Sequence, residues 1–291
     1  MTKPINRSLR ELPIGIFDSG IGGLTVVRQI HKTLPREDLI YLGDTARVPY
    51  GTKSPATVIR FACEDTAFLL RHKVKAVVVA CNTASAWALP TLQREFMLPI
   101  FGVIEPGVRT ALAQSRNRRI GVIATRATVR SQAYPTSIRA RDPRVRVWAR
   151  ACPLLVPLVE EGWLKHPVTN AVLREYLAPL LRQRVDTLVL GCTHYPLLKS
   201  AIQVLAGRNV QLVDSAKSCA DYVREGLENL GLLTHGRRRK GIIRPFVTDD
   251  VDRFQAMAAR FLDFPTKPPR QVELAAHISK RPGTFRCASR R

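Results

Sequence analysis

The sequence predicts an α/β protein with two pseudo-symmetric, doubly wound parallel-sheet lobes and a site in the cleft between them. Three observations support this fold class. Short apolar runs rich in β-branched residues alternate with segments of helix length, as in parallel sheets covered by helices on both faces. The second half of the chain repeats the pattern of the first half. Each half also places a cysteine after a small residue where an apolar run ends.

Length and composition agree with a soluble globular protein. The 291 residues, 45% of them hydrophobic and 24% charged, are enough for a large core divided between two lobes. No apolar run reaches the roughly 18 residues that a membrane span needs, and the first residues lack an apolar signal segment. We therefore expect a cytoplasmic protein without membrane attachment. The six scattered cysteines contain no C-x-x-C pair, which favours reduced thiols over disulfides or zinc ligands.

The formal net charge of +23 is unusually high. Such a charge can attract nucleic acid or an acidic surface. The basic residues are spread along the chain, however, and no nucleic-acid motif accompanies them. We expect contact with nucleic acid only through non-specific charge, and a positive field that attracts a small anionic substrate.

The first half begins with a strand, a glycine-rich turn and a helix. The turn, 18–23, lacks the G-x-G-x-x-G pattern of phosphate-binding turns and begins with Asp18. A carboxylate is a poor neighbour for phosphate and a better one for an ammonium group. The predicted elements are, in order, strands at 14–17 and 39–42, a polar loop at 43–51, a helix over 54–72, a strand at 77–80, a helix from Ala84 and a strand at 100–104.

The second half repeats this order. Residues 120–125 match 14–19 at an offset of 106, and residues 185–193 match 74–82 at an offset of 111. A strand at 145–148, a loop at 155–162 and a helix over 169–182 lie between them. Each half therefore has its cysteine at the end of its third strand, and two such repeats predict two similar lobes.

The last part of the chain adds a strand at 210–214 and a helix over 216–230. A further strand over 242–249 contains Pro245, which predicts a position at a sheet edge, and a helix over 250–264 follows. Residues 265–291 are rich in proline and basic residues, which favours a flexible tail.

The paired cysteines, Cys81 and Cys192, have three interpretations. Both are buried structural thiols in the first. In the second, Cys192 is the nucleophile of a Cys–His hydrolase assisted by His194, which leaves Cys81 without a role. In the third, two thiols on opposite walls of a cleft transfer protons, one removing a proton from carbon and the other delivering one to the opposite face. The repeat favours the third interpretation because it supplies two matched groups.

A thiol is a weak base until its pKa falls toward the working pH. Groups that activate or orient the two thiols are therefore expected nearby. Asp18 ends the first strand of the first half, Glu160 lies on the loop after the second strand of the second half, and His194 follows Cys192 by two residues. No metal cluster or cofactor motif is visible, so we expect a reaction without a cofactor.

Several stretches closely resemble the bacterial glutamate racemases of the aspartate/glutamate racemase superfamily. They are GIFDSGIGGLTV at 15–26, GDTARVPYG at 43–51, ACNTASA at 80–86 and LGCTHYPL at 190–197. Shorter matches lie at 104–107, 121–125, 158–162 and 246–249. The resemblance covers about residues 13–262.

The resemblance implies cofactor-independent interconversion of L- and D-glutamate, which supplies D-glutamate for peptidoglycan. It implies Cys81 and Cys192 as the acid/base thiols, with Asp18 assisting Cys81, and with His194 and Glu160 assisting Cys192. The implied substrate contacts are Asp18, Ser19, Tyr50, Gly51, Asn82, Thr83, Thr193 and His194. The implied first lobe is discontinuous (10–98 with 210–264), the second lobe is 99–209, and 265–291 form the basic tail. A homodimer is also implied.

Two rival functions remain open. A relative acting on aspartate or another amino acid would share these motifs and differ in substrate. A nucleic-acid-binding or regulatory protein that retains the fold would not need the cysteine pair with its three helpers.

Overall fold

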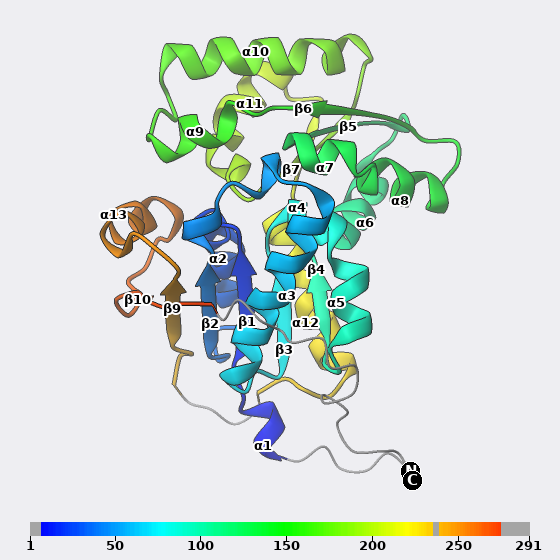
Figure 1. The fold of residues 1–291 in the computed structure, drawn as a ribbon. Coiled ribbons are helices and arrows are strands. Elements are labelled where there is room, and N and C mark those ends of the chain that lie inside the picture. Colours follow the sequence, from blue (N-terminus) through cyan, green and yellow to red (C-terminus); the bar gives the residue numbers. More distant parts are fainter. Residues whose placement is uncertain (1–6, 235–238, 275–291) are drawn as a thin grey trace.

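The computed structural model describes residues 7–234 and 239–274, and within them all paired strands run parallel in two sheets. The first sheet has the order β10-β9-β2-β1-β3-β4 and the second β6-β5-β7-β8 (Figure 1). The strands of the first sheet are β1 (Ile14–Asp18), β2 (Leu39–Gly43), β3 (Ala76–Val79), β4 (Ile100–Gly102), β9 (Ile243–Val247) and β10 (Arg270–Gln271). Those of the second are β5 (Arg119–Ala124), β6 (Arg146–Ala151), β7 (Thr187–Gly191) and β8 (Gln211–Asp214).

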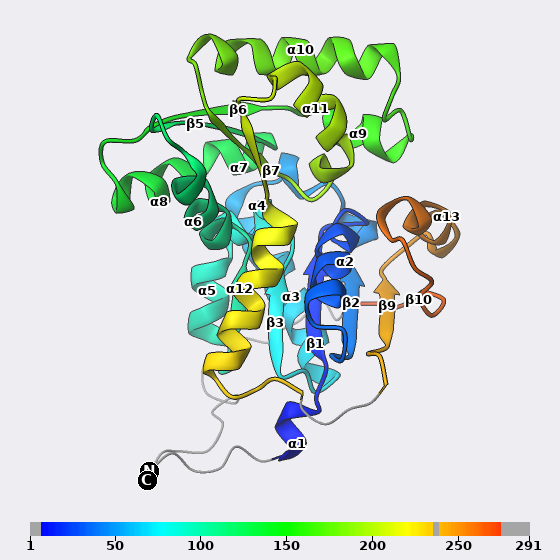
Figure 2. The same ribbon diagram turned by 180° about the vertical axis from the view of Figure 1, so that it is seen from behind.

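Helices cover both faces of the first sheet and flank the second. Figure 1 shows α3 and α5 on the near face of the first sheet, and Figure 2 shows α2 and α12 on the opposite face. The helices are α1 (Arg7–Arg10), α2 (Leu24–Thr33), α3 (Pro55–Arg71), α4 (Asn82–Trp87), α5 (Leu89–Glu95), α6 (Ile104–Gln114), α7 (Arg126–Arg130), α8 (Ala133–Arg141), α9 (Leu155–Glu160), α10 (Pro167–Arg182), α11 (Lys199–Ala206), α12 (Ser215–Asn229) and α13 (Val251–Phe261). None of the helices within the described ranges has the length and apolar character of a membrane span.

The predicted repeat and fold class are confirmed. The order β2-β1-β3-β4 in one lobe matches β6-β5-β7-β8 in the other. In each lobe the chain leaves the central strand toward one side and later adds strands on the other. A crevice forms at such a reversal, at the carboxyl ends of the strands. The ends of β1 and β3 thus define one wall of a cleft, and the ends of β5 and β7 define the facing wall.

Local sequence explains the helix that supports the first wall. Ser54 precedes α3, and its Oγ accepts a hydrogen bond from the Thr57 amide at 3.3 Å. Pro55 occupies the first helical turn, where its missing N–H has no intrahelical partner. The buried face of α3 includes Phe61 and Phe68, so packing against the sheet fixes the helix.

The lobe boundaries expected at 98/99 and 209/210 are each displaced by one strand. β4 pairs with β3 in the first sheet, and β8 pairs with β7 in the second. Each third strand would otherwise be an open, wholly apolar edge, and the fourth strand covers it. The chain therefore changes lobe in α6 and α12, which pack against each other.

The C-terminal segment is more ordered than its composition predicts. β10 pairs with β9, and the Val272 amide donates to the Val247 carbonyl at 2.9 Å. The strand with Pro245, predicted at a sheet edge, is β9, which is the second strand of the sheet because β10 pairs with its last two residues. Residues 265–274 have little apolar content, but their backbone pairs with the N–H and C=O groups that β9 would otherwise leave exposed, and this pairing orders the segment. The rest of the predicted tail, 275–291, lies outside the described residues.

Candidate active site between the lobes

Cys81 lies just beyond β3, directly before α4. The Ala84 amide donates to its Sγ at 3.5 Å, and its thiol donates to Ser19 Oγ at 3.7 Å. Burial, followed by the negative charge of Asp18, raises the pKa of the Cys81 thiol to about 12 despite these two contacts. In this environment Cys81 is a protonated thiol at neutral pH.

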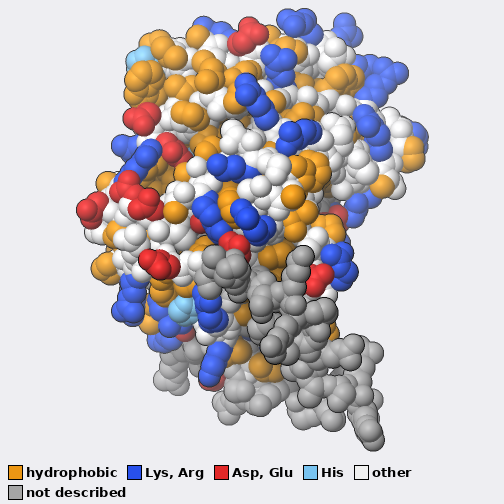
Figure 3. All heavy atoms as spheres, viewed as in Figure 1, with side chains coloured by type: hydrophobic (Ala, Val, Ile, Leu, Met, Phe, Trp, Pro, Cys, Tyr) orange, Lys and Arg blue, Asp and Glu red, His pale blue; other side chains and the backbone are white. Residues whose placement is uncertain are grey.

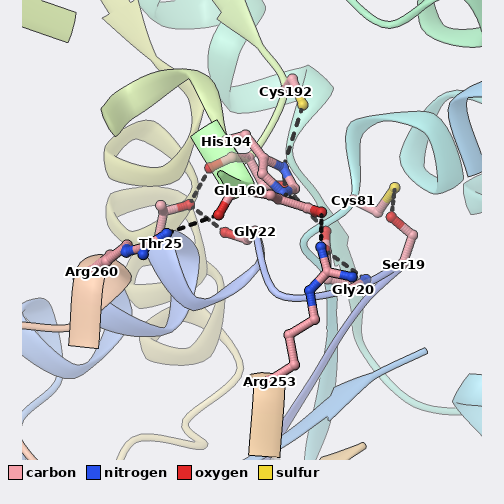
Figure 4. Close-up of polar contacts among 12 residues, drawn as sticks. Ser19, Gly20, Gly22, Thr25, Cys81, Glu160, Cys192, His194, Arg253 and Arg260 are labelled. Atoms are coloured by element: carbon pink, nitrogen blue, oxygen red, sulfur yellow. Dashed lines mark hydrogen bonds and ion pairs between the residues drawn. The ribbon is translucent and has the colours of Figure 1, made fainter. Parts of the chain in front are cut away.

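Cys192 follows β7 on the opposite wall, and its partners are different (Figure 4). Its Sγ lies 3.9 Å from His194 Nδ1, and His194 Nε2 lies 3.0 Å from Glu160 Oε1. Burial alone lowers the pKa of His194, but the contacts with Cys192 and Glu160 outweigh it and raise the pKa to about 10. The thiol therefore faces an imidazolium ion held by a carboxylate.

Glu160 is held in turn by α13, which belongs to the other lobe. Arg253 Nη2 lies 3.4 Å from Glu160 Oε2, and Arg260 Nη1 donates to the Glu160 carbonyl at 2.8 Å. Phe261 presents its ring edge-on to His194, with the centroids 5.7 Å apart. Burial would raise the pKa of Glu160, but His194 and Arg253 lower it below its usual value. One face of α13 thus fixes the pair beside Cys192, as Figure 4 shows.

Asp18 ends β1 and is completely buried. Its Oδ2 accepts the Gly20 amide at 3.1 Å, and its Oδ1 faces the Thr193 hydroxyl at 3.4 Å. Burial raises the pKa of Asp18, and the charge of His194 and these donors oppose the rise. Thr25 donates to the Thr193 carbonyl at 2.9 Å. Asp18 and Thr193 therefore meet where the two lobes touch.

Asn82 and Thr83 begin α4 and face the second lobe. Tyr134 donates to Asn82 Oδ1 at 2.8 Å, whereas the buried Asn82 Nδ2 has no hydrogen-bond partner. The Thr83 hydroxyl lies 2.9 Å from that of Thr125 and 3.1 Å from that of Thr128. Buried donors are rarely left unpaired, so Asn82 Nδ2 is a free donor for a bound molecule.

Tyr50 and Gly51 differ from the other residues expected to contact substrate. The buried Tyr50 hydroxyl is bonded to Asp44 at 2.5 Å and to Asp65 at 2.9 Å. Gly51 lies against the second lobe, where a Cβ would come within 2.9 Å of Thr125 Cβ. Because the Tyr50 side chain is committed elsewhere, only the backbone of this segment is available to a ligand.

The glycines of the 18–23 turn have a packing reason. A Cβ on Gly22 would lie 2.4 Å from the His194 ring, and one on Gly23 would lie 2.4 Å from Asp18 Cβ. Real Cβ contacts are never so short, so both positions need glycine. The turn is thus shaped to receive acid/base side chains from both lobes.

The structure brings the two sets of predicted residues together, with Cys81, Asp18, Ser19, Asn82 and Thr83 on one wall and Cys192, Thr193, His194 and Glu160 on the other. Sequence reasoning did not identify Tyr134, Thr128, Arg253 or Arg260. The repeat was the one available signal for this part of the site, because it aligns Thr125, the neighbour of Thr128 in the structure, with Ser19. Within 7–234 and 239–274, no three His, Cys, Asp or Glu side chains are arranged to hold a metal ion.

Comparisons with known proteins agree with this geometry. The sequence model of the Asp/Glu/Hydantoin racemase family matches residues 14–249. Glutamate racemase from Geobacter metallireducens is 52% identical over 263 residues, which are 90% of this chain and 97% of that protein. The structure of glutamate racemase RacE1 from Bacillus anthracis superposes with a TM-score of 0.88 at 37% identity, covering 91% of this chain and 98% of that one. That of Francisella tularensis glutamate racemase, in complex with D-glutamate, gives 0.85 at 36% identity, covering 92% and 100%.

The fold and site define an isomerase with two facing thiols in a cleft between two parallel-sheet lobes. The chain belongs to the Asp/Glu/Hydantoin racemase family and, within it, to the bacterial glutamate racemases.

Proposed function

We propose that this racemase interconverts L- and D-glutamate by two-base proton transfer, without a cofactor, and supplies D-glutamate for peptidoglycan in the cytoplasm. The observation that supports it best is the placement of Cys81 and Cys192. They occupy equivalent positions of the repeat, each after the third strand of its lobe, and both are buried. One thiolate takes the proton from Cα as the opposite thiol gives its proton to the other face. Each turnover leaves the two thiols with exchanged protonation states.

The substrate itself can complete the activation of Cys81. Asp18 is the charge that most raises the pKa of this thiol after burial. An α-ammonium group paired with Asp18 would neutralise that charge and ease loss of the thiol proton. On the opposite wall the His194 imidazolium places a positive charge 3.9 Å from Cys192 Sγ.

The substrate carboxylates need donors, and the cleft offers them. Asn82 Nδ2 is buried without a partner, and the hydroxyls of Thr83 and Thr193 lie nearby in the wall. We assign glutamate, not aspartate, as the substrate because relatives that share about half of their residues with this chain are named glutamate racemases. The resemblance also supports a homodimer. The sedimentation coefficient of the purified protein would test this.

The experiment combines racemisation with α-proton exchange in deuterium oxide. We expect the wild type to racemise either enantiomer, and Cys81→Ala and Cys192→Ala each to lose racemisation by at least about 10³-fold. Cys219→Ala is the matched control because it removes a buried thiol in α12, among the core residues. Full racemase activity in both site variants would exclude the two-thiol mechanism.

A substrate panel decides the rival within the family. If aspartate were converted with a larger kcat/KM than glutamate, the glutamate assignment would be wrong. Sequence-selective DNA binding that persists at high salt would instead support a nucleic-acid role, since binding by charge alone weakens steeply with salt.

A further inference from the structure

A second hollow lies on the outer edge of the first sheet, where α3 ends beside β9 and β10. Its volume is about 320 Å³, which is within the range of small-ligand sites. The basic side chains that line it are His72, Arg244, Lys267 and Arg270, and the apolar ones are Phe246 and two prolines. None of its lining residues belongs to the cleft between the lobes.

The charges of this hollow are of one sign. No carboxylate lines it, and the side chains of Arg244, Lys267 and Arg270 make no ion pair or hydrogen bond with any described residue. Arg47 and Arg239, in the same lobe, are both paired with carboxylates. Three unpaired cations around one concavity repel one another, and a bound anion would relieve this repulsion.

The strand register gathers these side chains. Arg244 and Phe246 are two residues apart on β9 and so point to the same face. β10 pairs Arg270 with Phe246, which places the second guanidinium beside the first. The segment that the sequence predicts to be a flexible tail therefore forms one wall of the hollow.

The floor of the hollow is aromatic. The two aromatic rings that line it, those of His72 and Phe246, have centroids 4.8 Å apart. The ring of Phe68, which does not line the hollow, packs against both, with centroid distances of 4.7 Å to His72 and 5.4 Å to Phe246. His72 is only half-buried, whereas Phe246 is buried and reaches the hollow with little of its surface. A planar group can therefore rest on this floor by stacking, within reach of the cations.

We propose that this hollow binds a small phosphorylated molecule with a planar ring. Its phosphate or diphosphate oxygens pair with Arg244, Lys267 and Arg270, because guanidinium groups match the geometry of phosphate. Its ring stacks on His72, next to Phe246.

His72 provides an internal reporter for the occupant. Burial, and then the positive charges of Arg244 and Arg71, lower the pKa of His72 below its usual value. The groups that face it are the Arg71 side chain at the end of α3, Arg244 on β9, and Lys267 and Arg270 across the hollow. An anion bound among them would raise the pKa of His72.

The test titrates the full-length protein with ADP, inorganic pyrophosphate and inorganic phosphate at constant ionic strength. Calorimetry gives the affinities, and the ring signals of His72, assigned with His72→Gln, follow the site by NMR. We expect ADP to bind more tightly than pyrophosphate, pyrophosphate more tightly than phosphate, and each to raise the pKa of His72. Unmoved His72 signals at saturating ADP would overturn the site, and equal affinity for ADP and pyrophosphate would overturn the role of the ring.

A matched pair of variants separates a built site from general attraction. Figure 3 shows Lys and Arg side chains scattered across the described face among hydrophobic and neutral ones, so non-specific binding of anions has to be measured. We expect Arg244→Gln with Arg270→Gln to weaken ADP binding by at least about 10-fold and to leave racemisation unchanged. The control, Arg146→Gln with Arg208→Gln, removes the same charge from exposed positions elsewhere. An equal loss in the control would show that charge alone attracts ADP, and the proposal would fail.

Discussion

The two walls of the cleft are built from the same repeat but differ in electrostatics. Cys81 is surrounded by neutral donors and the carboxylate of Asp18, and its pKa is raised to about 12. Cys192 faces an imidazolium that Glu160 and Arg253 hold in place. The repeat therefore fixes where the thiols lie, whereas the charged groups beside them differ: a carboxylate near Cys81 and an imidazolium beside Cys192.

The largest difference is expected between two variants, one that removes the ionic partner of Cys192 and one that removes a neutral partner of Cys81. His194→Asn should lower kcat by about 10²–10⁴-fold, since it removes the only cation beside Cys192 among the described residues. Ser19→Ala removes one weak contact from Cys81 and should cost about 10-fold or less. Steady-state kinetics with both enantiomers measures the contrast. Equal losses in the two variants would mean that the walls are functionally alike.

Gly22→Ala should be the next most harmful change. Its Cβ would meet the His194 ring and the Thr193 hydroxyl at 2.4 Å, so the imidazole must move away from Cys192. We expect kcat to fall about 10-fold or more while the protein stays folded, as followed by circular dichroism. Gly207→Ala is the control, because nothing lies within 4 Å of its Cβ position, although its positive φ adds local strain. Unchanged kinetics in Gly22→Ala would contradict the placement of His194.

The pH dependence of stability should also differ between the walls. The pKa of His194 is about 10 in the folded protein, above its usual 6.5. The stabilisation of the fold by protonated His194 is therefore fully present below pH 6.5 and is lost as the pH rises toward 10. Glu160→Gln removes the partner carboxylate, so its Tm should fall less than that of the wild type between pH 7 and 10. Parallel curves from thermal denaturation would show that this pair does not contribute.

Arg253→Gln should have the smallest effect of these changes. The Arg253 side chain is about half exposed, and its 3.4 Å contact with Glu160 is partly screened by solvent. We expect kcat to fall by about 10-fold or less and the alkaline limb of the pH–rate profile to move to lower pH as His194 loses support. Arg146→Gln, an exposed arginine on β6, is the control. A pH profile identical to that of the wild type would show that α13 does not act on the dyad.

The features that the sequence could predict are local or repeated. The fold class, the cysteine pair and every strand except β10 follow from apolar periodicity and an internal match, and those features were predicted. The contacts of α13 with Glu160 were not, because they join residues 93 and 100 positions apart. Periodicity shows that a helix has a buried face but not which distant side chain it meets.

Two further differences have related causes. The lobe boundary was displaced by one strand because β4 and β8 complete the edge of their own sheets, a tertiary requirement without a sequence signal. β10 was missed because its proline-rich surroundings predict no strand, and only the exposed edge of β9 supplies its partner. The Tyr50 hydroxyl is held by Asp44 and Asp65, which lie six positions before it and fifteen after it, so the substrate contact predicted for Tyr50 is left to its backbone.

The unequal walls have a thermodynamic consequence. Two enantiomers have the same free energy in water, so the equilibrium constant of a racemisation is one and the Haldane relation requires equal kcat/KM in the two directions. The imidazolium beside Cys192 cannot favour one enantiomer in that ratio. Its influence can appear only as matched changes in kcat and KM, so that the direction with the larger saturated rate must also have the larger KM. An asymmetric site can thus set how full the enzyme is with each enantiomer while leaving the mixture it produces unchanged.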